Sequence, residues 1–290
     1  MSYLLQLFKL ARPYQWTKNI FVFTGLLFGH GWERPALILQ SVLAFFAFCL
    51  VSSGVYVLND IVDRDADREH PEKCERPLAS GTVSLRAALL LLVLLWSGGF
   101  SLGVFVSRPL GIILGIYVLM NIAYSMRLKQ EPVLDVFLLA SGFVLRILGG
   151  TLGLDIPPSQ WLLLTGTAVS LFLGFVKRRA ELLRLGDDPG KHRKVLQFYS
   201  DKMLDGAIVI SATVAIVSYG LYSMSEHARL VHGTDQLIYT VPLVMYGIFR
   251  YLHLLYSARG GGDPSRDLLR DPHVLVAGVI WAGVTIYLIS

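Results

Sequence analysis

The chain has 290 residues, of which 54% are hydrophobic and only 16% are charged, whereas a soluble domain carries about 25% charged residues. This composition excludes an ordinary water-soluble enzyme. Charge-poor apolar runs recur along the whole length, so we expect residues 1–290 to form a single transmembrane domain. The net charge of +5 does not indicate nucleic-acid binding, because basic residues that flank membrane helices commonly set topology.

The apolar runs predict an all-α protein with nine membrane-spanning helices. Residues 1–11 precede them and are typical of a short amphipathic helix rather than a signal peptide. Proline marks the start of several runs, as it often does at the first turn of a helix. The expected spans are 15–31, 36–59, 85–106, 109–126, 132–153, 158–177, 203–224, 237–257 and 272–289.

The distribution of basic residues predicts the orientation of these spans. If the N-terminus is cytoplasmic, most of the 26 Lys and Arg residues fall in cytoplasmic connections, which is the positive-inside pattern. We therefore expect a plasma-membrane protein with a cytoplasmic N-terminus and an external C-terminus. The chemically rich segments, residues 59–67, 124–129 and 177–200, then all face the cytoplasm.

An acidic stretch at residues 59–67 is the clearest candidate site. Asn59, Asp63 and Asp67 are spaced i, i+4, i+8, which places them on one face of a helix that leaves the membrane, with Asp60 beside that face. Oxygen-only ligands suit a hard cation such as Mg²⁺. We interpret Asn59, Asp63 and Asp67 as metal ligands in a magnesium and diphosphate clamp, and count Asp60 with them as catalytic. The alternative is a solvated acidic helix end paired with neighbouring arginines.

The loop at residues 68–81 mixes basic and turn-forming residues. Lys73 and Arg76 could close over an anionic substrate once a metal is in place. Equally, both residues could simply be charges that set topology.

The pattern Asn-Asp-x-x-Asp-x-x-x-Asp at residues 59–67, followed by Arg-Pro-Leu-Ala-Ser-Gly at 76–81, resembles the first aspartate motif of the UbiA superfamily of intramembrane prenyltransferases. The similarity covers about residues 10–225. It implies helices that enclose a central cavity, open to the cytoplasm and laterally to lipid. Further stretches resemble one branch of the superfamily: 12–19, 65–71, 124–129, 133–135, 141–146 and 177–182.

That branch differs from other members in a second motif. Most members carry a second aspartate motif near the end of the sixth helix, but residues 177–181 here are Lys-Arg-Arg-Ala-Glu. The resemblance implies Mg²⁺-dependent transfer of a 5-phosphoribosyl group from phosphoribosyl pyrophosphate to a polyprenyl, decaprenyl-like phosphate. Basic side chains suit the phosphate on C5 of that donor. Ordinary membrane anchoring is the alternative for at least half of the basic residues between 177 and 202.

Arg146 lies well inside the fifth predicted span, where a charged residue costs roughly 2.5–3.5 kcal/mol on insertion scales. It could contact a substrate phosphate, or pair with Asp135 or another buried acid. Tyr124 and Tyr199 could reach the same cavity or be interfacial tyrosines. The expected substrate-binding residues are Lys18, Lys73, Arg76, Tyr124, Lys129, Arg146, Lys177, Arg178, Glu181, Arg193 and Tyr199.

Two other functions compete with this interpretation. A conventional prenyltransferase would share the first motif, but it lacks support from a second aspartate motif. A transporter or scaffold would not need Asp63 and Asp67 for its function. The partners implied by the favoured interpretation are the phosphoribosyl donor, the lipid phosphate and the membrane, and it leaves room for a homo-oligomer.

Overall fold

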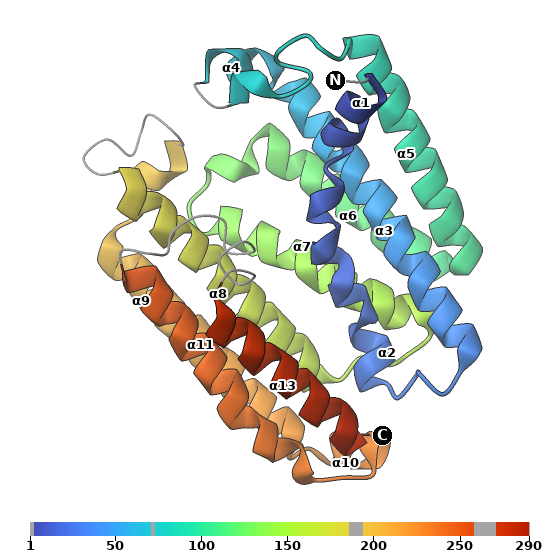
Figure 1. Ribbon diagram of the computed structural model, residues 1–290, viewed down its shortest axis with the longest axis vertical. Coiled ribbons are helices and arrows are strands. Elements are labelled where there is room, and N and C mark those ends of the chain that lie inside the picture. Colours follow the sequence, from blue (N-terminus) through green and yellow to red (C-terminus); the bar gives the residue numbers. More distant parts are fainter. Residues whose placement is uncertain (1–2, 71–72, 186–193, 258–270, 290) are drawn as a thin grey trace. The chain divides into compact units, whose positions relative to one another are not determined.

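The computed structural model describes residues 3–70, 73–185, 194–257 and 271–289, and these residues form helices, turns and loops without a β-strand (Figure 1). The all-α prediction is therefore confirmed. The chain divides into two compact units, Met1–Arg127 with Leu145–Pro157 and Leu128–Val144 with Pro158–Ser290. The helix α7, Leu134–Gly150, contributes its first part to unit 2 and its last turns to unit 1. A single domain over the whole chain stays a prediction.

Unit 1 is built around α3, which packs on η1, α1, α5 and α6. The 28 residues of α3 rise about 42 Å, which exceeds the hydrocarbon core of about 30 Å. Its final turns, with Asn59 and Asp60, can therefore extend into the interfacial region. The elements of this unit are α1 Tyr3–Ala11, η1 Pro13–Phe23, α2 Thr24–Phe28, α3 Pro35–Val62, α4 Arg64–Glu69, η2 Lys73–Glu75, α5 Leu85–Val106, α6 Arg108–Met126 and η4 Leu152–Leu154.

The segment predicted as the first span, residues 15–31, differs from the prediction. It forms the 3₁₀-helix η1 and the five-residue α2 instead of one long α-helix. A Cβ on Gly25 would overlap the backbone of Gly150, and one on Gly150 would overlap the backbone of Val22. This close backbone contact with the end of α7 is a tertiary feature, so the hydrophobic pattern alone could not predict it. The two helices would still rise roughly 30 Å end to end.

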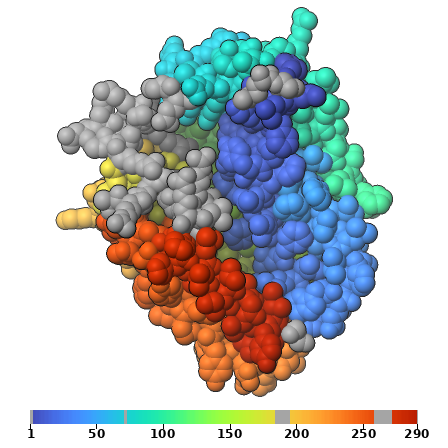
Figure 2. All heavy atoms as spheres, in the orientation of Figure 1, coloured from blue at the N-terminus to red at the C-terminus, as the bar shows by residue number. Residues whose placement is uncertain are grey.

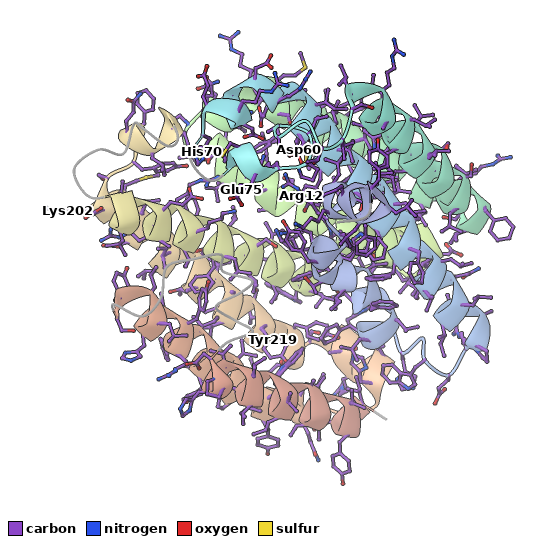
Figure 3. The ribbon with its side chains drawn as sticks, turned by 45° about the horizontal axis from the view of Figure 1, so that its top comes forward. Arg12, Asp60, His70, Glu75, Lys202 and Tyr219 are labelled. Atoms are coloured by element: carbon purple, nitrogen blue, oxygen red, sulfur yellow. The ribbon has the colours of Figure 1, made fainter. Side chains whose placement is uncertain are left out.

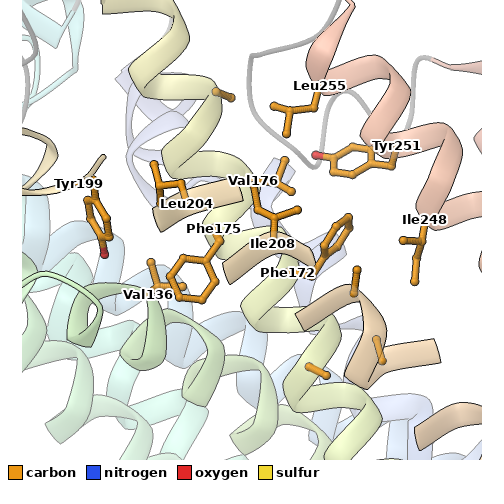
Figure 4. Close-up of a cluster of buried hydrophobic side chains, with 14 of the residues drawn as sticks. Val136, Phe172, Phe175, Val176, Tyr199, Leu204, Ile208, Ile248, Tyr251 and Leu255 are labelled. Atoms are coloured by element: carbon orange, nitrogen blue, oxygen red, sulfur yellow. The ribbon is translucent and has the colours of Figure 1, made fainter. Parts of the chain in front are cut away.

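Unit 2 is held together by α8, α9 and α11. Helices α8 and α9 pack extensively against each other, and α11 packs on α9 and α13. Figure 4 shows their shared core, in which Phe172 and Val176 of α8 lie with Ile208 of α9 and Tyr251 of α11. The elements of this unit, besides the start of α7, are η3 Leu128–Gln130, α8 Gln160–Leu185, η6 Lys194–Phe198, α9 Asp201–Ser223, α10 Glu226–His232, η7 Gln236–Thr240, α11 Val241–Tyr256 and α13 Pro272–Ile289.

Eight helical segments among the described residues are long and apolar enough to cross a membrane. Their outer faces are apolar too: on α5, for example, Leu90, Val93 and Phe105 are each at least 60% exposed, as lipid contact requires. The protein is therefore a multi-pass membrane protein. The count of nine spans is not confirmed, because the segment at 15–31 lacks a long α-helix.

Candidate functional site

The acidic residues lie where α3 passes into α4. The amide of Asp63 donates to the carbonyl of Asn59 at 2.9 Å, and the amide of Asp67 donates to the carbonyl of Asp63 at 2.8 Å. These two hydrogen bonds meet at Asp63, where α3 ends and α4 begins, and the common face of the three residues stays a prediction. Asp67 is buried, whereas the side chain of Asp65 on the same short helix is 92% exposed.

Basic side chains neutralise two of these carboxylates. Arg76 Nη1 lies 3.1 Å from Asp60 Oδ1 and 2.6 Å from Asp67 Oδ2, and Lys73 Nζ lies 3.9 Å from Asp67 Oδ1. Arg12 forms an ion pair with Asp60, and both residues are labelled in Figure 3. The guanidinium of Arg12 also lies over the ring of Tyr56. The group therefore combines acidic helix residues with cations from two other segments of unit 1.

A well-fixed turn positions Arg76. Its carbonyl accepts from the amide of Ser80 at 2.9 Å, and the carbonyl of Pro77 accepts from the amide of Val83 at 2.9 Å. Gly81 has φ +78°, a conformation that glycine adopts without steric cost. Leu78 and Val83 are buried with Leu10 of α1, and Figure 2 shows the blue atoms of the N-terminal segment beside the cyan atoms of this region. The positive φ of residue 81 therefore favours glycine at this position of the turn.

Asn59 is oriented by the end of α6. Ser125 Oγ lies 2.5 Å from Asn59 Oδ1 and 2.8 Å from the carbonyl oxygen of Asn121, and its single hydroxyl hydrogen can be donated to one of these acceptors at a time. Tyr124, one of the predicted substrate-binding residues, is the neighbour of Ser125 on α6 and is half-buried. The predicted metal ligand Asn59 is thus held by a residue that the sequence prediction did not include.

The donor set suits a hard divalent cation. Asn59, Asp63 and Asp67 offer only amide and carboxylate oxygens, and these are the ligands that Mg²⁺ prefers. Within the described parts of the chain, no group of three or more His, Cys, Asp or Glu side chains could hold a metal ion together. The predicted site contains only two carboxylates, those of Asp63 and Asp67, because its third ligand is the side-chain amide of Asn59. The oxygens of Asp67 contact Arg76 and Lys73 in this structure.

Arg146 occupies a buried polar network in unit 1. Its Nε donates to Asn19 Oδ1 at 2.7 Å, its Nη2 donates to the hydroxyl of Tyr117 at 3.0 Å, and its guanidinium lies over the Tyr117 ring. Asn19 in turn donates to Ser52 Oγ at 3.3 Å. The expected alternative of a pair with Asp135 is wrong, because Asp135 pairs with Arg178. These contacts tie α7 to η1 and α6, and a contact between Arg146 and a phosphate stays a prediction.

The basic stretch of α8 is built into ion pairs in unit 2. Arg178 Nε lies 2.7 Å from Asp135 Oδ2 and its Nη1 lies 2.7 Å from Glu181 Oε2, with Arg178 and Asp135 both completely buried. Tyr199 donates its hydroxyl hydrogen to Asp135 Oδ1 at 2.6 Å. Arg179 pairs separately with carboxylates of α9.

The predicted residues therefore fall into two groups. Unit 1 contains the acidic residues with Lys18, Lys73, Arg76, Tyr124 and Arg146, and unit 2 contains Lys129, Lys177, Arg178, Glu181 and Tyr199. Arg193 lies outside the described residues. The sequence prediction missed Arg12 and Ser125, although both belong to stretches that resemble the superfamily. It treated Asp135 only as a partner for Arg146.

Comparison with known proteins gives a consistent result. A family model described as the UbiA prenyltransferase family matches residues 19–266. A decaprenyl-phosphate phosphoribosyltransferase of Mycolicibacterium smegmatis is 33% identical over 96% of this chain and 90% of its own length. An enzyme of the same name from Corynebacterium glutamicum is 32% identical over 94% of this chain and 83% of its own length.

Solved structures agree on the fold. A UbiA homolog from Archaeoglobus fulgidus, bound to GPP and Mg²⁺, superimposes with a TM-score of 0.71 at 17% sequence identity, and the match covers 98% of each chain. At that identity the likeness concerns the arrangement of helices alone. The helical fold deduced from the hydrophobic pattern is thus shared with proteins of this kind.

Proposed function

Since the chain belongs to the UbiA prenyltransferase family, we propose that it transfers a 5-phosphoribosyl group from phosphoribosyl pyrophosphate to a polyprenyl phosphate and releases pyrophosphate. The observation that carries the proposal is the 33% identity, over nearly the entire chain, with a decaprenyl-phosphate phosphoribosyltransferase. The basic stretch at residues 177–179 agrees with it, because a second diphosphate site of the prenyl type would call for carboxylates there.

The acidic group of unit 1 is assigned to the diphosphate of the donor. Asn59, Asp63 and Asp67 would hold Mg²⁺, and the bound ion would supply positive charge to offset the negative charge of the pyrophosphate leaving group. Arg76 and Lys73 already lie against Asp67, so small side-chain movements would let their N–H groups bind diphosphate oxygens. Asp60 lies between Arg12 and Arg76 and is assigned to orienting these two guanidinium groups.

The basic residues of unit 2 are assigned to the binding of a substrate phosphate. Lys129 on η3 and Lys177 on α8 are half-buried, and each can present an ammonium group to an anion. Arg178 is completely buried and forms ion pairs with two carboxylates, so its guanidinium stabilises the packing of unit 2. We therefore assign Lys129 and Lys177, rather than Arg178, to direct phosphate contact.

The reaction needs no strong general base. A phosphate monoester already carries about 1.5 to 2 negative charges near pH 7, so an oxygen of the lipid phosphate can attack C1 directly. One C1–oxygen bond forms to the lipid phosphate, and the C1–oxygen bond to pyrophosphate breaks. The protein's contribution is to align the two anions and offset their repulsion. We place this site at the cytoplasmic face of the plasma membrane, where the basic residues of the sequence are concentrated.

Product analysis with purified protein tests the proposal. The protein in detergent micelles is incubated with Mg²⁺, decaprenyl phosphate and phosphoribosyl pyrophosphate, and a parallel reaction contains a prenyl diphosphate with an aromatic acceptor. We expect a phosphoribosylated lipid, seen by mass spectrometry, and pyrophosphate release only in the first reaction. Release from the prenyl diphosphate, with none from phosphoribosyl pyrophosphate, would show a conventional prenyltransferase. A transporter or scaffold would release pyrophosphate in neither reaction.

A further inference from the structure

The backbone at Val133 has an uncommon conformation. Its φ is +68°, which is a true outlier for a β-branched residue. The amide of Leu134 donates to the carbonyl of Pro132 at 2.7 Å, so Val133 is the centre of a three-residue turn with the features of the rare, strained γ-turn. Such a conformation persists only where surrounding contacts determine it, and it is commonest at functional sites.

A buried hydrogen-bond chain fixes this turn. The amide of Val133 donates to the hydroxyl oxygen of Tyr199 at 2.7 Å, and that hydroxyl donates to Asp135 Oδ1 at 2.6 Å. The other oxygen of Asp135 accepts from Arg178 Nε at 2.7 Å. Figure 4 shows Tyr199 beside Val136 at the edge of the core of unit 2. One carboxylate therefore joins three segments: the turn before α7, helix α8 and the residues after η6.

Each of two joined segments carries an expected phosphate ligand. Lys129 lies on η3, four residues before Val133, and Lys177 directly precedes Arg178 on α8. We infer that Asp135 and Tyr199 are positioning residues that fix the turn bearing Lys129 relative to α8, so that both lysines are ordered before the donor binds. This inference rests on the proposed function for the identity of the anion, a sugar phosphate.

The protonation of Tyr199 is consistent with this role. Burial raises the pKa of its hydroxyl, and the hydrogen bond to Asp135 raises that pKa further. The phenol therefore stays protonated at neutral pH, and it can donate to Asp135 while it accepts from Val133. Asp135 is completely buried, so it acts through these neighbours and not by touching substrate. A lysine that is held in place loses less conformational freedom when a phosphate binds.

The substitution Tyr199→Phe tests the inference, with Tyr222→Phe as a matched control. Both residues are buried in unit 2, and each substitution removes one hydroxyl; that of Tyr222 lies 2.8 Å from His232 Nε2, away from Asp135 and the turn at Val133. The readouts are hydrogen exchange of peptides covering residues 128–131, thermal stability, and the KM and kcat for phosphoribosyl pyrophosphate. We expect faster exchange and a roughly three- to tenfold higher donor KM for Tyr199→Phe, as for the loss of one hydrogen bond. kcat should change little, and the control should change neither exchange nor KM.

A double-mutant cycle with Lys129→Gln separates positioning from general damage. If Tyr199 acts through Lys129, adding Tyr199→Phe to Lys129→Gln raises the donor KM by less than twofold. A fully additive increase in KM, or unchanged exchange at residues 128–131, would overturn the inference. Hydrogen exchange is measured without substrate. It therefore tests whether Tyr199 orders residues 128–131 even if the protein uses another donor. Absence of phosphoribosyl transfer by the unaltered protein would refute only the proposed function.

Discussion

The two charged groups differ in how deeply their ion pairs are buried. In unit 1 the carboxylates of Asp60 and Asp67 are buried, but their cationic partners are partly exposed: 18% for Arg12, 30% for Arg76 and 42% for Lys73. In unit 2 both members of the central pair, Arg178 and Asp135, are 0% exposed. Partly exposed cations can turn toward a bound anion, whereas the buried pair cannot separate without leaving an uncompensated charge.

This difference shows that a run of basic residues in a sequence does not measure how many charges are available to a ligand. Of the three basic residues 177–179, Arg178 and Arg179 both contact carboxylates of their own unit. The acidic motif at residues 59–67 instead lies against side chains that a diphosphate could attract. We therefore expect substitutions of the acidic residues at 59–67 to affect mainly catalysis, and substitutions of Arg178 or Asp135 to affect mainly stability.

The largest expected effect is that of Asp67→Asn. The substitution removes a predicted metal ligand and the partner of Arg76, so stabilisation of the departing pyrophosphate should fall sharply. We expect kcat to fall about 1,000-fold, which corresponds to about 4 kcal/mol, while the thermal unfolding temperature changes little. Steady-state kinetics over a range of Mg²⁺ concentrations would measure the effect.

Asp65→Asn is the matched control for Asp67→Asn. It makes the same chemical change on the same helix α4, but the Asp65 side chain is 92% exposed and contacts Arg68 only at 3.7 Å. We expect less than a threefold change in kcat. Equal losses from both substitutions would mean that the helix as a whole, and not the buried carboxylate, is needed for activity.

Asp135→Asn should have the largest effect on stability. Arg178 would keep Glu181 as a partner, but its completely buried guanidinium would lose its other anion. Removing one member of a buried pair costs about 3 kcal/mol or more, and thermal unfolding in detergent would measure the loss. Asp201→Asn removes a carboxylate that is 60% exposed and pairs with Arg179, so we expect a loss below about 1 kcal/mol. A smaller loss for Asp135→Asn than for Asp201→Asn would contradict the comparison.

Gly81→Ala should affect unit 1 more modestly. A Cβ there meets no atom within 4 Å, but the residue has φ +78°, and an L-residue in the left-handed region costs about 1–2 kcal/mol. Because this turn positions Arg76, we also expect a higher donor KM. Gly115→Ala is the control: a Cβ on this glycine of α6 also meets nothing, and alanine favours a helix. The two substitutions should therefore shift the unfolding temperature in opposite directions.

The sequence predicted most of the helices because their signals are local. The apolar run at 85–106 coincides with α5, and the proline before residue 36 begins α3. The 3₁₀ conformation of η1 was not predictable, since it accompanies the close backbone contact of Gly25 and Gly150. Helical periodicity likewise grouped Asn59, Asp63 and Asp67 without any knowledge of tertiary structure.

Ion pairs between distant segments were not predictable. Arg12 and Asp60 are 48 residues apart in sequence, and Arg178 and Asp135 are 43 residues apart. Charge and spacing cannot show which Arg meets which Asp, so Arg12 was missed and Asp135 was offered as a partner for Arg146. Helix periodicity acts within one element, whereas these pairs depend on how several elements pack.

The smallest expected effect comes from an ion pair outside both groups. Asp271, just before α13, binds Arg250 with Oδ2 to Nη2 at 2.7 Å and accepts from the amide of Val274. The hydrogen bond from Arg250 is the main reason that the pKa of Asp271 falls from 3.8 to about 2. Because the folded pKa is the lower one, the stabilisation is complete above about pH 4 and is lost as the pH falls toward 2.

We therefore expect Asp271→Asn to lower the unfolding temperature by about 1–2 °C at pH 6. The difference from the unaltered protein should shrink when both are measured at pH 3, because Asp271 of the unfolded chain, with its ordinary pKa of 3.8, is then largely protonated while folded Asp271 is still ionised. A difference that stays constant between pH 6 and pH 3 would mean that the amide side chain disturbs packing rather than charge. Asp135 offers the contrast: its partner Arg178 is buried, so replacing it should destabilise the protein by several times as much at pH 6.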